Sequence, residues 1–369
     1  MHAALALNLD AALLRASVRL LEAGEVEAVE WSFDAPYAVA EAPAWFTDLL
    51  GHFAGAGRLY GHGVFFSLFD GRWRPEQEAW LRHLRATVER FDLRHVSEHF
   101  GFFSGADFHR GAPLGVPLTA RTLALGRDRL ARLADAARRP VGLENLALAF
   151  GPDDVARQGE FLDALLAPTD GFVILDLHNL YCQADNFGVD AAALLRRYPL
   201  HRVRELHLAG GSWVDSDVEP GRRVRRDTHD DRVPAEVWDL LDLALAHCPR
   251  AELAVLEHLG AHLGTREQGE GFRADFRRLR DTLRAAEPPA ADAPLTPEGP
   301  PAAPAVDATP LVDRELYAQQ RALVEILATA PEARAAHARL READLPAWGV
   351  DAWDVAMVET AMRIVRKWA

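Results

Sequence analysis

The chain has 369 residues, of which 49% are hydrophobic, and its formal net charge is −14. This acidic balance argues against a protein whose main task is to bind a phosphate backbone, and no stretch approaches the ~20 consecutive apolar residues of a membrane span. Two cysteines, Cys182 and Cys248, are too few for a disulfide framework or a thiolate metal cage and are typical of a reducing cytoplasm. We therefore expect a cytoplasmic protein that binds neither nucleic acid nor a membrane, and any metal must be held by nitrogen and oxygen.

The first 286 residues alternate short β-rich runs with stretches of helical periodicity. Eight apolar runs have the length of a strand, and most gaps between them carry a 3.6-residue period, as in "PAEVWDLLDLALAHC". Eight successive strand–helix units predict an α/β fold of the (β/α)8, or TIM-barrel, type. In chain order the runs are "ALALN", "EVEAVEW", "RLYGHG", "LRHVSEH", "VGLEN", "GFVILDLHN", "RVRELHLAGG" and "AELAVLEHLG".

The composition changes after the last barrel helix. Residues 287–310 include eight prolines in 24 positions, which predicts an extended linker. Three amphipathic segments within residues 311–369 predict a small C-terminal helical bundle. The predicted domains are thus a metal-binding barrel (1–286), a linker (287–310) and a helical domain (311–369).

Two interpretations of the C-terminal bundle remain open. It could be a docking module for a partner, or it could bury its aromatic side chains against itself or the barrel, which is the interpretation we favour. The apolar residues concerned are Trp348, Trp353, Trp368, Leu323, Ile326 and Leu327.

Ionisable side chains stand at the ends of six consecutive predicted strands. In a TIM barrel the carboxyl ends of all strands meet at one mouth, so these residues should converge. Four carboxylates at that distance would repel one another unless cations lay between them. Imidazole and carboxylate donors without thiolates suit Zn, Fe or Mn, and eight donors imply two or three ions. The candidates are His62, His99, Glu144, Asp176, His207 and Glu257 at strand ends, with Asp227 and His229 on the connection after the seventh strand.

Each candidate also has a structural interpretation. A single histidine is usually a hydrogen-bonded structural residue, Asp176 could cap a helix, and Asp227 could stabilise an Asx-turn. The coincidence of so many donors favours metal binding, with Glu144 as a bridging carboxylate. In "RHVSEHFGF" we expect His99 to hold an ion and His95 to support it.

Several of these stretches together resemble the multinuclear non-haem iron-dependent oxidative enzymes. This family includes the methanobactin biosynthesis oxidase and the oxidase that excises a β-carbon from cysteine in 3-thiaglutamate synthesis. The resemblance covers about residues 1–280 and is carried by "GHG", "HVSEH", "GLENLAL", "LDLHNLY", "ELHLAGG", "DTHDDRVPAEVW" and "LEH". It implies that the eight candidates and Asn179 form an iron site.

The same resemblance implies a reaction. The cofactor would be two or three irons of mixed Fe(II)/Fe(III) valence, with O2 as co-substrate. The substrate would be a ribosomally synthesised precursor peptide, oxidised most commonly at cysteine. A separate partner protein would deliver the leader segment of that peptide.

Other functions are compatible with this layout. It is also similar to the endonuclease IV group of tri-zinc enzymes, in which D-x-x-H stands where this chain has Asp176 followed by Asn179. That amide favours iron, but a tri-zinc phosphoesterase and a metal-dependent sugar isomerase or epimerase of the xylose isomerase type remain alternatives. A metal-storing barrel ranks lowest, because it would leave a costly charge cluster without a purpose.

Three residues near the predicted mouth are harder to assign. The family often has a histidine where this chain has Gly211, which puts any role of that imidazole in doubt. His178, within "DLHN", could be an extra ligand, an outer partner of a ligand or a barrel-wall residue, and we favour the last two. Cys182 could lie near the mouth, although a small buried hydrophobe is the interpretation we favour.

Overall fold

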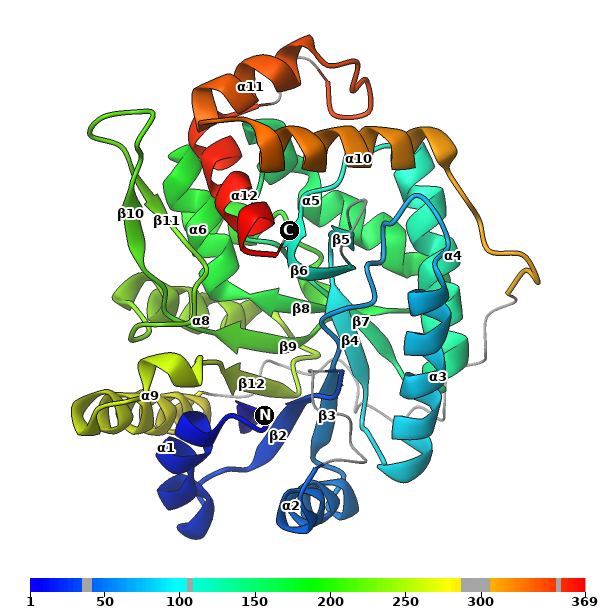
Figure 1. Ribbon diagram of the computed structural model, residues 1–369. Helices are drawn as coiled ribbons and strands as arrows, with labels where there is room; N and C mark the ends of the chain where they lie inside the picture. The colour runs from blue at the N-terminus through cyan, green and yellow to red at the C-terminus, as the bar shows by residue number, and fades with distance from the viewer. Residues whose placement is uncertain (35–41, 105–108, 287–305, 350–352, 369) are drawn as a thin grey trace.

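The computed structural model describes residues 1–34, 42–104, 109–286, 306–349 and 353–368. Eight parallel strands close into a barrel in the order β1-β12-β9-β8-β7-β4-β3-β2 (Figure 1). Each predicted run overlaps one of these strands, so the predicted (β/α)8 TIM-barrel fold is confirmed. The barrel strands are β1 (His2–Leu7), β2 (Ala28–Ser32), β3 (Leu59–His62), β4 (Val96–His99), β7 (Val141–Glu144), β8 (Phe172–Asp176), β9 (Val203–Leu208) and β12 (Leu253–Leu256).

A helix follows each barrel strand and covers its outer face. Local signals start several of these helices: the Asp10 carboxylate accepts from the amides of Ala12 and Leu13, and Thr265 forms a capping box with Gln268. The barrel helices are α1 (Ala11–Glu22), α2 (Ala44–Gly55), α3 (Pro75–Arg90), α4 (Ala120–Ala137), α5 (Pro152–Leu166), α6 (Leu177–Phe187), α7 (Ala191–Leu195), α8 (Ala235–His247) and α9 (Arg266–Ala285). In the described part of the chain no helix is both long and apolar enough to cross a membrane.

The barrel interior is divided into an apolar layer and a polar layer. The apolar layer is a small separate cluster that includes Ala28, Tyr60 and Val255. Since side chains alternate along a strand, the inward residue two positions later belongs to the next layer. On these three strands that residue is ionisable, and the three residues are Glu30, His62 and Glu257. Because side chains alternate along each strand, the ionisable inward residues lie nearer the carboxyl ends than the apolar ones.

Two antiparallel hairpins interrupt the regular alternation, and neither was predicted from the sequence. The first joins β5 (Phe102–Ser104) to β6 (His109–Leu114) after β4, and the second joins β10 (Trp213–Asp215) to β11 (Arg223–Arg225) after β9. The strands β5, β10 and β11 have only three residues each, which are too few to show a clear alternation of polar and apolar side chains, and β6 contains Gly111 and Pro113, which weaken a strand signal. Both hairpins belong to connections at the carboxyl ends of barrel strands.

The three predicted C-terminal helices are present. They are α10 (Arg314–Thr329), α11 (Ala333–Glu342) and α12 (Val355–Trp368), and they lie together at one end of the molecule, where α12 contacts β6 (Figure 1). Trp348 and Trp353 are buried with their rings stacked at 6.3 Å, and Trp353 lies 4.9 Å from the ring of Phe150 on the barrel.

The C-terminal bundle therefore buries these two tryptophans, as the favoured interpretation expects. Leu323, Ile326 and Leu327 are buried as well. The side chain of Trp368 and residues 287–305 of the predicted linker lie outside the described residues. The division into a barrel, a linker and a helical domain remains a prediction.

Candidate metal centre

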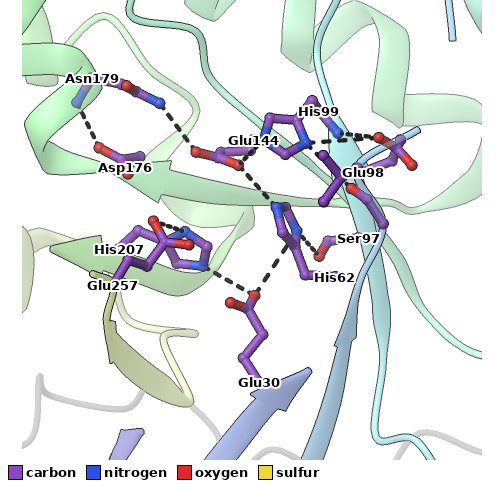
Figure 2. A network of polar contacts seen from close by, with 12 residues as sticks. Glu30, His62, Ser97, Glu98, His99, Glu144, Asp176, Asn179, His207 and Glu257 are labelled. Atoms are coloured by element: carbon purple, nitrogen blue, oxygen red, sulfur yellow. Dashed lines mark hydrogen bonds and ion pairs between the residues drawn. The ribbon is translucent and has the colours of Figure 1, made fainter. Parts of the chain in front are cut away.

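Glu144 lies at the meeting point of two histidines. Its Oε2 atom is 3.2 Å from His62 Nε2 and 3.3 Å from His99 Nε2, and its Oε1 accepts from Asn179 Nδ2 at 3.0 Å (Figure 2). The register of the barrel produces this arrangement, because His99 on β4 pairs directly with Glu144 on β7. We call His62, His99 and Glu144 the strand-end corner.

A second group shares Glu144. Glu144, Asp176, His207 and Glu257 each offer a ligand atom, and these atoms lie within 4.8 Å of one another. His207 Nδ1 is 3.2 Å from Glu257 Oε2. Asp176 also caps α6, since its Oδ1 accepts from the amide of Asn179 at 2.5 Å. Its structural role and its candidate ligand role are therefore compatible, because each uses a different oxygen.

The remaining two candidates come from the connection between β11 and α8. His229 Nε2 lies 2.8 Å from Asp227 Oδ1 and 3.9 Å from Glu257 Oε2, so this connection reaches the same centre. His229 has a φ of 49°, in the left-handed region that non-glycine residues rarely adopt, and its carbonyl accepts from the amide of Leu259 at 2.8 Å. We call Asp227 and His229 the loop corner.

Several polar atoms at the centre lie within ion-pair distance of one another but make no hydrogen bond. Each unpaired buried polar atom costs about 1–3 kcal/mol, so a cluster of them needs a physical reason. Cations bound between the side chains would supply that reason, because carboxylate, amide and imidazole atoms are donors that can bind them. Among the described residues, the atoms without a hydrogen-bond partner here are Glu30 Oε2, Asp176 Oδ2, Asn179 Oδ1, His207 Nδ1, His229 Nε2 and Glu257 Oε2.

Groups outside the centre orient the histidines of the strand-end corner. Ser97 Oγ donates to the carbonyl of Gly61 at 3.3 Å and accepts from His62 Nδ1 at 2.8 Å. His99 Nδ1 donates to the carbonyl of Gly63 at 3.2 Å. Both imidazoles therefore turn Nε2 toward Glu144, as metal-binding histidines do when a second group holds the other nitrogen.

His207 has the opposite ring orientation, with Nδ1 and not Nε2 directed toward the candidate ligands. Its Nε2 donates to Glu205 Oε1 at 3.3 Å and lies 3.2 Å from Glu30 Oε2, which leaves Nδ1 facing Glu257 (Figure 2). His95 Nε2 lies 2.6 Å from the other oxygen of Glu205. His95 thus supports the centre through Glu205.

Sequence reasoning missed Glu30, Glu205 and Ser97. Each could have been found from the period of the strands, because Glu30 follows the inward Ala28 of β2 by two positions. Glu205 and Ser97 precede His207 and His99 by two positions and so share their inward faces.

The electrostatics of the centre show a surplus of negative charge. Burial by itself would lower the pKa of His62, but Glu30 and Glu144 outweigh it and raise the pKa to about 10. Burial, and after it the charge of Glu144, raises the pKa of Asp176 well above its usual value. In the metal-free chain a protonated His62 would offset part of the carboxylate charge, and a bound cation would take the place of that proton.

The three residues that were hard to assign lie beside the loop corner. His178 is fully buried, and its Nδ1 is 3.2 Å from Asp227 Oδ1, so it is an outer partner of a candidate ligand. A Cβ at Gly211 would lie 2.7 Å from His178 Cε1 and would overlap the carbonyl of Arg226. Position 211 therefore has no room for an imidazole. Cys182 is buried against the ring of His178, as expected of a small hydrophobe.

Two solved structures were compared with this chain, and only the first is similar enough to support the fold. A xylose isomerase domain protein from Planctomyces limnophilus is 14% identical with a TM-score of 0.50, covering 77% of this chain and 97% of that one. Endonuclease IV from Thermus thermophilus is 16% identical with a TM-score of 0.48, covering 76% of this chain and 100% of that one. At 14% identity the likeness to the xylose isomerase domain protein concerns the fold alone.

Sequence relatives identify the family. A UPF0276 protein of Caulobacter vibrioides (strain NA1000 / CB15N) is 34% identical over 185 residues, which are 50% of this chain and 62% of that protein. The chain thus spans less than two thirds of this curated relative. The family model described as "RiPP precursor modification enzyme MbnB/TglH/ChrH" matches residues 20–258, which is more than half of the chain and includes all nine candidate ligands. The chain therefore belongs to the MbnB/TglH/ChrH family of enzymes that modify the precursors of ribosomally synthesised peptides.

Proposed function

We propose that this chain is a multinuclear iron-dependent oxidase that uses O2 to modify a ribosomally synthesised precursor peptide at cysteine. The observation that carries the proposal is the cluster of buried donor atoms without hydrogen-bond partners, in a member of a peptide-modifying family. Its imidazole nitrogens, carboxylates and one amide oxygen are donors that suit iron. The same family membership disfavours a phosphoesterase or a sugar isomerase.

The candidate ligands divide into sites for two or three ions. We assign one ion to the strand-end corner and a second to Glu144, Asp176, His207 and Glu257. A third ion would be bound by the loop corner together with Glu257, because His229 approaches that carboxylate. In this assignment two ions would share Glu144, two would share Glu257, and Asn179 would offer Oδ1 as a further ligand atom.

Iron, when bound, would supply the one-electron chemistry with O2 that a protein side chain cannot provide. The chain itself supplies the positions of the donors. Ser97, Gly63 and Glu205 hold the imidazoles so that a single nitrogen of each faces inward. The peptide would enter at the carboxyl ends of the strands, where the ligands lie. A separate leader-binding protein and a cytoplasmic location are also part of this proposal.

Metal analysis tests the proposal. The protein is produced anaerobically in iron-supplemented medium, and two or three irons per chain are expected. Stoichiometric zinc with nuclease activity would contradict the oxidase and favour the phosphoesterase. Activity on a sugar without O2 would favour the isomerase.

A peptide assay tests the substrate. The probe is a cysteine-containing peptide encoded by a short reading frame beside the gene, incubated with the iron-loaded protein and O2. We expect a mass change located at cysteine, and none when serine replaces that cysteine. A mass change that persists in the serine peptide would show that another residue is modified.

A further inference from the structure

Arg225, the last residue of β11, is fixed on several sides although it belongs to a short hairpin. It is 5% exposed, and its guanidinium lies 5.3 Å above the ring of Trp213 and 5.5 Å from that of Tyr181. The side chain of Asn186 accepts from the Arg225 amide at 2.8 Å and donates to its carbonyl at 2.9 Å. The position of Arg225 is therefore determined by packing and by α6.

Arg225 determines which nitrogen of His178 carries the proton. Arg225 Nε donates to His178 Nε2 at 3.3 Å, and a guanidinium has no acceptor. His178 Nε2 must therefore be the unprotonated nitrogen, and in the neutral ring the proton is on Nδ1. That N–H faces Asp227 Oδ1 at 3.2 Å and donates to it.

The hairpin that carries Arg225 is held by the C-terminal helices. Ser216 Oγ donates to Glu359 Oε2 on α12 at 2.9 Å, in a buried contact. Arg222 Nη1 donates to Asp354 Oδ2 at 2.9 Å, and Arg334 on α11 donates to the carbonyl of Val218. The C-terminal helices thus bind the turn of the hairpin. The second strand of the hairpin, β11, leads directly to Asp227.

We propose that His178 and Arg225 are positioning residues that orient the Asp227 carboxylate toward the metal centre, and that the C-terminal helices complete this corner by holding the β10–β11 hairpin. The inference rests on the proposed metal centre. An aspartate on a loop rotates freely about its side-chain bonds, so a donor fixed by a second residue restricts it to one orientation. Gly211 leaves the space that the His178 ring occupies.

The first test compares two substitutions of His178. Leucine removes both hydrogen bonds, whereas glutamine offers an oxygen to Arg225 and an amide N–H to Asp227. The full-length chain is titrated anaerobically with ⁵⁷Fe(II) alone, and bound iron is counted and examined by Mössbauer spectroscopy. We expect H178L to lose one iron per chain and its Mössbauer component, with about 10–100-fold weaker binding at that site, and H178Q to restore both.

A second test uses a matched pair on the hairpin. R225M removes the donor to His178, whereas R223M changes an exposed arginine on the same strand. E359Q, on α12, weakens the contact with Ser216. E342Q, at an exposed position of α11, is its control. We expect R225M to lose one iron, E359Q to weaken the same site less, and both controls to match the wild type.

The outcomes separate this inference from the proposed function. A wild-type chain that binds no iron would overturn both. If the wild type binds iron while H178L and R225M keep the full number, only the positioning role is overturned. An equal loss in R223M, or a loss of every iron in H178L that glutamine does not restore, would also overturn it.

Discussion

The strand-end corner and the loop corner present the same kinds of donor but are built differently. His62, Glu144 and His99 end barrel strands, and their side chains are 4%, 4% and 18% exposed. Asp227 and His229 are 27% and 21% exposed and lie on an irregular connection. A strand-end ligand is placed by the hydrogen-bonded register of the barrel, whereas a loop ligand depends on outer residues that exist for that purpose. The two corners should therefore respond differently to substitution.

The largest expected effect is at the residue that both inner groups share. Glu144→Ala should abolish binding of the two ions whose groups share Glu144 and leave at most the ion of the loop corner, because it removes a carboxylate from both groups. Total metal content measured by mass spectrometry of the folded protein checks this. Glu98→Gln is the control, since Glu98 is equally buried on the neighbouring strand but is absent from the candidate metal groups. Retention of two ions by Glu144→Ala would show that the corners are independent.

A substitution in the loop corner should remove fewer ions. Asp227→Asn should remove one ion per chain and leave the others, because the strand-end ligands do not depend on this connection. Stepwise titration with Fe(II) should show one fewer binding step than in the wild type. Loss of every ion would mean that the loop corner supports the whole centre and that the contrast between the corners is wrong.

The strand-end corner should also make the free energy of unfolding depend on pH. The pKa of His62 in the metal-free chain is raised from 6.5 to about 10. A raised histidine pKa stabilises the fold below pH 6.5, and this contribution is lost as the pH rises through about 10. The free energy of unfolding of the metal-free protein should therefore fall by on the order of a few kcal/mol between pH 6.5 and about 10.

Thermal unfolding of metal-free and iron-loaded protein between pH 6.5 and 10 measures this effect. The iron-loaded protein should show a smaller slope, because an ion then occupies the place of the proton. His62→Gln should reduce the slope of the metal-free protein. An unchanged slope in that variant would assign the effect to other groups.

The smallest expected effect concerns the hydroxyl behind His62. Ser97→Ala removes the acceptor for His62 Nδ1 but no candidate ligand. Iron stoichiometry should stay at the wild-type value, while affinity should fall by about tenfold, as is usual when a group behind a metal-binding histidine is lost. Loss of an ion in this variant would show that the strand-end corner relies on outer support as much as the loop corner does.

Most of the barrel could be read from local patterns. All eight strands were predicted, because each is an apolar run of the right length between helical stretches. The candidate ligands at the strand ends followed from the same patterns. Glu30 was overlooked because it lies in the middle of β2 and not at its end, and the strands β5, β10 and β11 have too few residues to produce a pattern.

The sequence by itself determined the order of the strands and the ionisable residues at their carboxyl ends, since both depend on hydrophobic runs and a period of two. Only the tertiary structure decided which nitrogen of each imidazole faces inward, because Ser97, Gly63 and Glu205 reach those rings from other strands or from an inner layer. It also decided that the C-terminal helices hold the β10–β11 hairpin, through contacts such as that between Ser216 and Glu359, 143 residues apart. Such contacts leave no periodic signal, since they depend on how distant parts of the chain pack together.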